Sequence, residues 1–112
     1  MTVREAAATL ELEIACTGDL DRRITGGYCG DLLSWVMSRA GQDNAWITIM
    51  CNLNTVAVAV LTDVSAVILA DGVRPDDGVL KRAGEQGVTL LCSSRSAFEL
   101  AGSLTRILEQ GR

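Results

Sequence analysis

The residues best suited to chemistry in this sequence are small polar groups that follow apolar runs. Ser93, Ser94 and Arg95 come directly after the apolar run that ends at Cys92. Hydroxyl, guanidinium and backbone N–H groups can hold an anion at such a position, where a helix can begin. Serines that precede a helix are also common capping residues, so the segment predicts either a helix cap or an anion site.

Further candidate ligand-binding residues lie near the ends of other apolar runs: Thr25, Gly26, Gly27, Asn52, Asn54 and Asp71. Two adjacent glycines allow a ligand to approach the backbone closely, although glycine pairs also form ordinary turns. The chain lacks both the G-x-G-x-x-G pattern and the P-loop pattern with its lysine. We interpret the loop aspartates as capping and turn residues rather than metal ligands.

Catalytic chemistry is restricted by the absence of histidine. Ser-His-Asp and Cys-His mechanisms are therefore excluded within this chain. A small hydrolase or transferase would need Asp71, Arg95 or Cys51, and this is our least favoured alternative. The four cysteines show none of the close spacings typical of metal sites. We therefore expect no catalytic residue, no metal site and no cofactor.

The composition predicts one domain over residues 1–112. Nearly half of the residues are hydrophobic (48%) and the net charge is −4. Scattered basic residues argue against nucleic acid as a partner, and the acidic balance argues against an anionic membrane surface. The longest apolar stretch, residues 55–70, is interrupted by polar residues, and the first ten residues do not resemble a signal peptide. With cysteines expected to be reduced, these features predict a cytoplasmic protein.

Periodicity predicts strands over residues 12–16, 45–50, 66–70 and 88–92. Helices are expected between and around them: a first helix capped by Thr2 with Glu5, then 32–39 capped by Asp31, 55–61 capped by Asn54, one capped by Asp76 or Asp77 and ending at Gly87, and a last one capped by Ser94 or Ser96. Residues 55–61 also alternate like a strand, but the short spacing between the neighbouring strands favours a helix. Residues 25–27 are expected to interrupt regular structure. The alternation predicts an α/β fold whose largely parallel or mixed sheet of about four strands is flanked by helices.

This fold predicts where a ligand and a partner would bind. Ligands of open parallel sheets lie beyond the carboxyl ends of the strands, where residues 51–54, 71–72 and 92–95 are expected. Residues 25–27 would join them if the preceding strand runs in the same direction. The helix over residues 32–39 is apolar nearly all round, which favours a cover supplied by a partner subunit. Its predicted interface residues are Leu32, Trp35, Val36 and Met37.

Several segments in order along the chain resemble the DRTGG domain family. They are Asp-Arg-Arg-Ile-Thr-Gly-Gly-Tyr at residues 21–28, Gly-Asp-Leu-Leu at 30–33, Trp-Ile-Thr-Ile at 46–49, Asn54, and Ser-Ala-Phe-Glu-Leu-Ala at 96–101. The resemblance implies an α/β domain like those attached to CBS domains or phosphotransacetylases, similar to the N-terminal part of HPr kinase/phosphorylase. In such settings the domain is regulatory or forms dimers, and catalysis belongs to another domain.

We therefore expect a non-catalytic regulatory module that forms a homodimer, with a small anion such as an adenine nucleotide as its candidate ligand. The alternative is a protein-interaction adaptor that has no small-molecule ligand and whose apolar helix binds a different protein.

Overall fold

Alternation along the strands divides the apolar residues between the two faces of one sheet. In the strand Ala66–Leu69 (β4) all four residues are buried. Ala66 and Ile68 belong to one cluster of core residues, whereas Val67 and Leu69 belong to another. Since successive side chains of a strand point to opposite faces, both faces of this sheet must be covered by helices.

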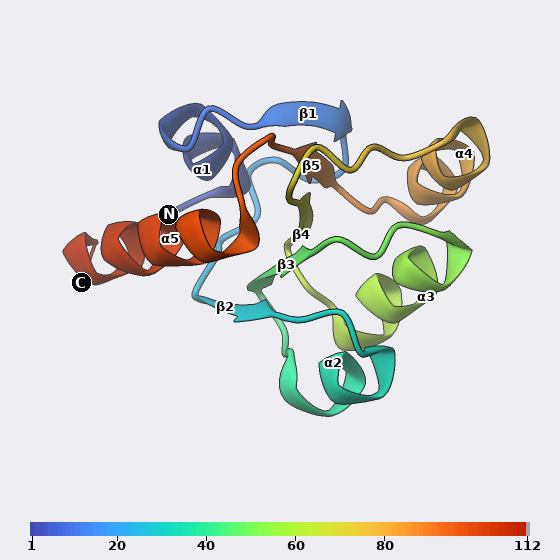
Figure 1. The fold of residues 1–112 in the computed structure, drawn as a ribbon, viewed down its shortest axis with the longest axis horizontal. Coiled ribbons are helices and arrows are strands. Elements are labelled where there is room, and N and C mark those ends of the chain that lie inside the picture. The colour runs from blue at the N-terminus through green and yellow to red at the C-terminus, as the bar shows by residue number, and fades with distance from the viewer. Residues whose placement is uncertain (112) are drawn as a thin grey trace.

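The computed structural model describes residues 1–111 and has this three-layer arrangement (Figure 1). Its elements are α1 (Val3–Thr9), β1 (Glu13–Cys16), β2 (Gly26–Cys29), α2 (Leu33–Arg39), β3 (Asn44–Thr48), α3 (Leu53–Thr62), β4 (Ala66–Leu69), α4 (Asp77–Gln86), β5 (Leu90–Cys92) and α5 (Ala97–Gln110). Helices α1 and α5 cover one face of the sheet, and α2, α3 and α4 cover the other. None of the helices described is long and apolar enough to cross a membrane.

The sheet has the strand order β1-β5-β4-β3-β2. Strands β2 to β5 are parallel and are connected by helices, whereas β1 runs antiparallel beside β5. The predicted α/β fold with a mixed sheet flanked by helices is therefore confirmed, with five strands among the described residues.

The fifth strand is β2, where the sequence had suggested a break. That prediction was wrong because Gly26 and Gly27 pair in register with Asn44 and Ala45 of β3. Packing explains the second glycine. A Cβ atom on Gly27 would lie 3.1 Å from Cδ2 of Leu104 on α5, which packs across this edge strand. A strand glycine here permits close approach of a helix.

Two predicted helix caps were also wrong. The side chain of Asn52, not that of Asn54, caps α3 by accepting hydrogen bonds from the next helical N–H groups. Asp31 does not cap α2, because its carboxylate accepts hydrogen bonds from Thr48 Oγ1 (2.7 Å) and the Ile49 N–H (2.9 Å). Asp31 therefore ties the loop after β2 to the end of β3.

The remaining caps agree with the sequence or decide between its alternatives. Thr2 and Glu5 form the predicted capping box of α1. Asp76 caps α4 and Ser96 caps α5, and α4 ends at Gly87 in the left-handed conformation. The starts of α1, α3, α4 and α5 are thus fixed by side chains close to the positions that the sequence indicated.

The connection from β1 to β2 depends on Gly18, which lies against the loop that leads into β5. Its N–H donates to Thr89 Oγ1 at 3.0 Å. A Cβ atom here would lie 2.4 Å from the carbonyl oxygen of Gly87 and 2.6 Å from Thr89 Oγ1. Because one of these atoms belongs to the backbone, the contact cannot be relieved by a side-chain rotation.

We predict that Gly18→Ala lowers the free energy of unfolding by about 2 kcal/mol, measured by urea denaturation. Gly84→Ala is the matched control, since a Cβ there meets no atom within 4 Å on the exposed side of α4. It should raise the free energy of unfolding by about 0.5–1 kcal/mol. Equal effects of the two substitutions would contradict the packing around Gly18.

Candidate functional site

A cleft of about 700 Å³ opens at the carboxyl edge of the parallel strands. It is lined by residues 9–11 and 13 from the end of α1 and start of β1, 72–74 from the loop after β4, and 92–95 from the loop after β5. Its position follows from topology, because β4 and β5 are adjacent parallel strands and β1 starts where β5 ends. It is the place at which ligands of open α/β sheets commonly bind.

Backbone hydrogen bonds join the two loops of the cleft. The N–H of Asp71 donates to the carbonyl of Arg95 at 2.8 Å, and the N–H of Gly72 donates to that of Ser93 at 2.9 Å. Asp71 and Gly72 both have positive φ angles, 57° and 77°. The turn after β4 therefore needs left-handed backbone, which the sequence Asp-Gly tolerates.

The serines of the predicted anion segment have different roles. Ser93 Oγ accepts a hydrogen bond from the Arg95 N–H at 3.0 Å and so shapes the turn. Ser96 Oγ accepts from the Glu99 N–H at 3.2 Å and caps α5. Ser94 is exposed on the wall of the cleft. The capping interpretation is therefore correct for Ser96, while Ser94 stays available to a ligand.

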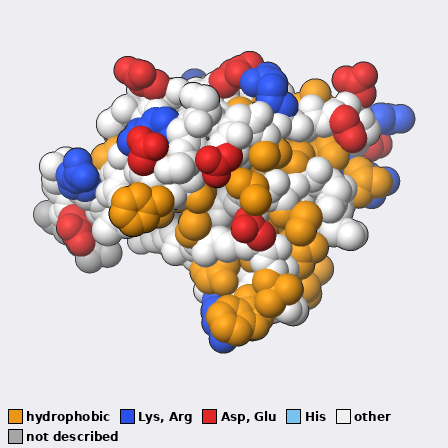
Figure 2. Space-filling model, viewed as in Figure 1, with side chains coloured by type: hydrophobic (Ala, Val, Ile, Leu, Met, Phe, Trp, Pro, Cys, Tyr) orange, Lys and Arg blue, Asp and Glu red, His pale blue; other side chains and the backbone are white. Residues whose placement is uncertain are grey.

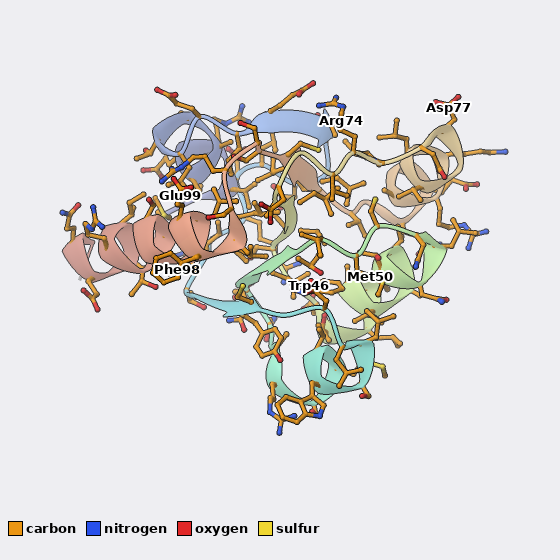
Figure 3. All side chains as sticks on the ribbon, viewed as in Figure 1. Trp46, Met50, Arg74, Asp77, Phe98 and Glu99 are labelled. Atoms are coloured by element: carbon orange, nitrogen blue, oxygen red, sulfur yellow. The ribbon has the colours of Figure 1, made fainter. Side chains whose placement is uncertain are left out.

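Two arginines face this region, and each has a carboxylate partner. Nη1 and Nη2 of Arg74 donate to the two carboxylate oxygens of Glu13 at 2.6 and 2.9 Å. Arg95 Nη2 donates to Ser103 Oγ at 2.9 Å, and its Nε lies 3.6 Å from Glu99 Oε2. Figure 3 shows Arg74 near β1 and Glu99 on the first turn of α5. Hydrogen bonds from Arg74, together with its charge, lower the pKa of Glu13.

The other predicted ligand-binding residues lie outside the cleft. Thr25, Gly26 and Gly27 are at the start of β2, and Gly26 pairs with the first residue of β3. They therefore lie at the amino edge of the parallel strands, opposite the cleft. Asn52 and Asn54 follow β3 at the carboxyl edge, yet they do not line the cleft. The structure thus brings together Ser93, Ser94 and Arg95 with the turn that contains Asp71.

Glu13 and Arg74 also line the cleft and were not predicted from the sequence. Arg74 could have been found, because it lies two residues beyond the Asp71-Gly72 turn that was predicted at this edge. Glu13 gave no comparable signal. Its place opposite Cys92 depends on the antiparallel pairing of β1 with β5, which no local pattern encodes.

The thiols are poorly suited to nucleophilic chemistry. Burial, with smaller contributions from Cys92 and Asp76, raises the pKa of Cys51. Burial likewise raises the pKa of Cys92 in the cleft. The reactive form is the thiolate, which is less populated when the pKa is raised.

Residues 1–111 contain no group of three or more cysteine or acidic side chains placed to hold a metal ion.

An apolar surface extends over α2 and along α3 (Figure 2). Leu32, Trp35 and Met37 are exposed, with 53% of Trp35 accessible and the guanidinium of Arg39 3.8 Å from the centre of its ring. Val36 is completely buried in the core beneath α2, so its assignment to an interface was wrong. Further exposed apolar side chains lie on α3 and in the segment before it: Ile49, Leu53, Val60 and Leu61.

Comparison with known proteins supports the fold. No family model and no curated protein matches the sequence. The structure is similar to the CBS and DRTGG domains of the regulatory region of Clostridium perfringens pyrophosphatase, solved in complex with its activator, diadenosine tetraphosphate. The TM-score is 0.70 with 12% identity, over 90% of this chain and 44% of that chain. The chain thus has a fold of the DRTGG/CBS kind and spans less than half the length of the chain that it matches.

The Glu13–Arg74 ion pair predicts a pH-dependent contribution to stability. Because the pKa of Glu13 is lower in the folded chain, its charge stabilises the fold above the unfolded pKa, near 4.5, and this contribution is lost as the pH falls through the folded value. Urea denaturation should show Glu13→Gln less stable than wild type at pH 7 and equal to it in acid. The control is Glu11→Gln, which should show no such change, because Glu11 forms no ion pair among residues 1–111. A stability difference that persists in acid would contradict the role of the charge.

Proposed function

We propose that this chain is a non-catalytic regulatory domain of the DRTGG type, which binds a small phosphorylated ligand in the cleft at the carboxyl edge. The observation that carries this proposal is the cleft itself, where hydroxyl, guanidinium and backbone groups of two hydrogen-bonded loops converge. The shared fold adds support, because the similar protein is a regulatory region whose activator is a dinucleoside polyphosphate. Adenine nucleotides are therefore the first ligands to test.

The dimensions and lining of the cleft suit such a ligand. Its volume falls within the range of small-molecule sites, roughly 300–1,000 Å³. Ser94 and Arg95 supply a donor and a positive charge for phosphate, and Gly72 leaves its side of the wall without a side chain. Val73, which is partly exposed, adds apolar surface on which a base can lie.

The same groups suit binding better than turnover. The thiol of Cys92 is buried with a raised pKa, and the carboxylate of Glu13 is held by Arg74. A general base or nucleophile needs a group that is free to react and whose pKa lies near the working pH. We infer that the response to ligand is a change in conformation or assembly.

The exposed surface of α2 supports the second part of the proposal, a homodimer. Trp35 is a large aromatic residue that is half exposed on a helix whose neighbours Leu32 and Met37 are also exposed. Large apolar patches of this kind mark interaction surfaces in globular proteins. A second copy of the chain would cover Trp35 in a symmetric interface.

An adaptor that binds a different protein through this same surface is the alternative function. It is favoured by the extent of the apolar surface, which continues from α2 onto Leu53 and Leu61 of α3. The two functions differ in their response to ligands, since an adaptor without a small-molecule site would show none.

The ligand proposal predicts a selective rise in melting temperature with nucleotides. At 100 times the dissociation constant a ligand adds about 2.7 kcal/mol, which raises the melting temperature of a domain this size by about 10 °C or more. Arg95→Gln should abolish the rise, whereas Arg106→Gln, a matched change on α5 outside the cleft, should retain it. A panel of mono-, di- and trinucleotides without any shift would refute the ligand proposal and favour the adaptor.

The dimer proposal predicts that Trp35→Ser weakens self-association in sedimentation velocity experiments. Phe98→Ser is the matched control, because Phe98 is 89% exposed on α5, in the other helical layer. Losing an aromatic anchor from the centre of an interface costs about 2 kcal/mol or more, or at least about thirty-fold in the dimer dissociation constant. A wild-type chain that remains monomeric at micromolar concentration would rule out the homodimer.

A further inference from the structure

The Arg74–Glu13 pair has the geometry of a bound ligand. Two guanidinium N–H groups meet two carboxylate oxygens, at 2.6 and 2.9 Å, in a bidentate arrangement. Phosphate offers the same pair of oxygens with more negative charge, so the guanidinium that holds a carboxylate in this way also suits a phosphate group. Glu13 therefore occupies the position at which an anion would bind Arg74.

The pair is also open to exchange. Both side chains are more than half exposed, 57% for Arg74 and 60% for Glu13, and they lie on the wall of the cleft. Exposed ion pairs are weak, because water solvates both partners when they separate. A ligand that enters the cleft can therefore replace the carboxylate without uncovering buried charge.

The Arg74–Glu13 pair connects two segments of the chain, so displacement of Glu13 by a ligand would change how they are held together. Among residues 1–111 it is the side-chain ion pair that connects β1 to the loop after β4. Glu13 is the first residue of β1, and residues 9–11 at the end of α1 line the same cleft. Releasing Glu13 would remove this connection between the β1 segment and the loop that carries Arg74.

We propose that Arg74 is a phosphate-binding residue of the cleft and that Glu13 is its internal competitor, displaced when a phosphate ester binds. This inference rests on the proposed ligand site and adds its chemistry. Two hydrogen bonds to carboxylate are replaced by two to phosphate, so the gain in binding must come from the larger charge of the phosphate and from further contacts to Ser94 and Arg95. Phosphate esters are therefore preferred over simple carboxylates.

The test is calorimetric titration of the full chain with ADP and with inorganic phosphate at constant ionic strength, in wild type, Glu13→Gln, Glu11→Gln and Arg74→Gln. Glu13→Gln removes the competitor and should tighten binding by about five-fold, the effect of one unit charge about 4 Å away in water. Glu11→Gln removes the same charge from the cleft without touching Arg74 and should have a smaller effect. Arg74→Gln should weaken binding, and circular dichroism should show that all four chains are folded.

The outcomes separate the two levels of the proposal. Tighter ligand binding by Glu13→Gln than by Glu11→Gln, together with loss of binding in Arg74→Gln, supports the proposal that Glu13 competes with the ligand for Arg74. Equal effects of the two glutamate substitutions, or unchanged binding by Arg74→Gln, would overturn the role of Glu13 as competitor. The proposed function would still hold if the ligand binds wild type and Arg95→Gln abolishes that binding. No binding by any variant would overturn both.

Discussion

The burial of the central strands on both faces is the constraint on which the rest of the structure depends. Every residue of β4 and β5 is buried, and neither strand can be left uncovered on one side. Helices must therefore lie on both faces. Each connection between parallel strands must run from the carboxyl edge of the sheet back to its amino edge. The connections put loops from different parts of the chain side by side at the carboxyl edge. The cleft is a consequence of this arrangement rather than of any single motif.

The proposed anion site lies in a chain with net negative charge. Its two arginines are each paired with a carboxylate, through two short hydrogen bonds at Glu13 and a longer contact at Glu99. Pairing partly neutralises each arginine, so a monovalent anion such as chloride would gain little at the proposed site. A ligand must instead make several contacts at once, which favours selectivity.

Much of the fold could be predicted from the sequence, because its signals are local. Alternating apolar residues identified the central strands, and glycine, serine and aspartate marked the helix ends to within a few residues. The prediction failed at β2, since Gly26 and Gly27 have low strand propensity and are kept in the sheet by pairing with β3 and by the approach of Leu104. It also failed at Asp31, whose carboxylate is used by β3 rather than by the next helix.

The lining of the cleft was predictable only where it follows the carboxyl ends of parallel strands. Ser93, Ser94 and Arg95 line the cleft as expected, because the end of a strand can be recognised in the sequence. Glu13 could not be found, because its position is set by contact between the first and last strands. Val36 was misassigned for a related reason. When apolar residues lie on every side of a helix, the sequence indicates that most of the helix surface is buried. It does not indicate which side faces the sheet.

The pairing of β1 with β5 has a consequence for folding during synthesis. Glu13 lies opposite Cys92, and the core beneath α1 includes Leu100 and Leu104 of α5. Residues 3–16 are synthesised before residues 90–104 but cannot be fully packed until those later residues have followed. Contacts of such long sequence separation slow folding and leave apolar residues such as Val3 and Leu10 exposed meanwhile. The segment of α1 and β1, which lines one side of the cleft, is therefore the one that depends longest on protection from aggregation.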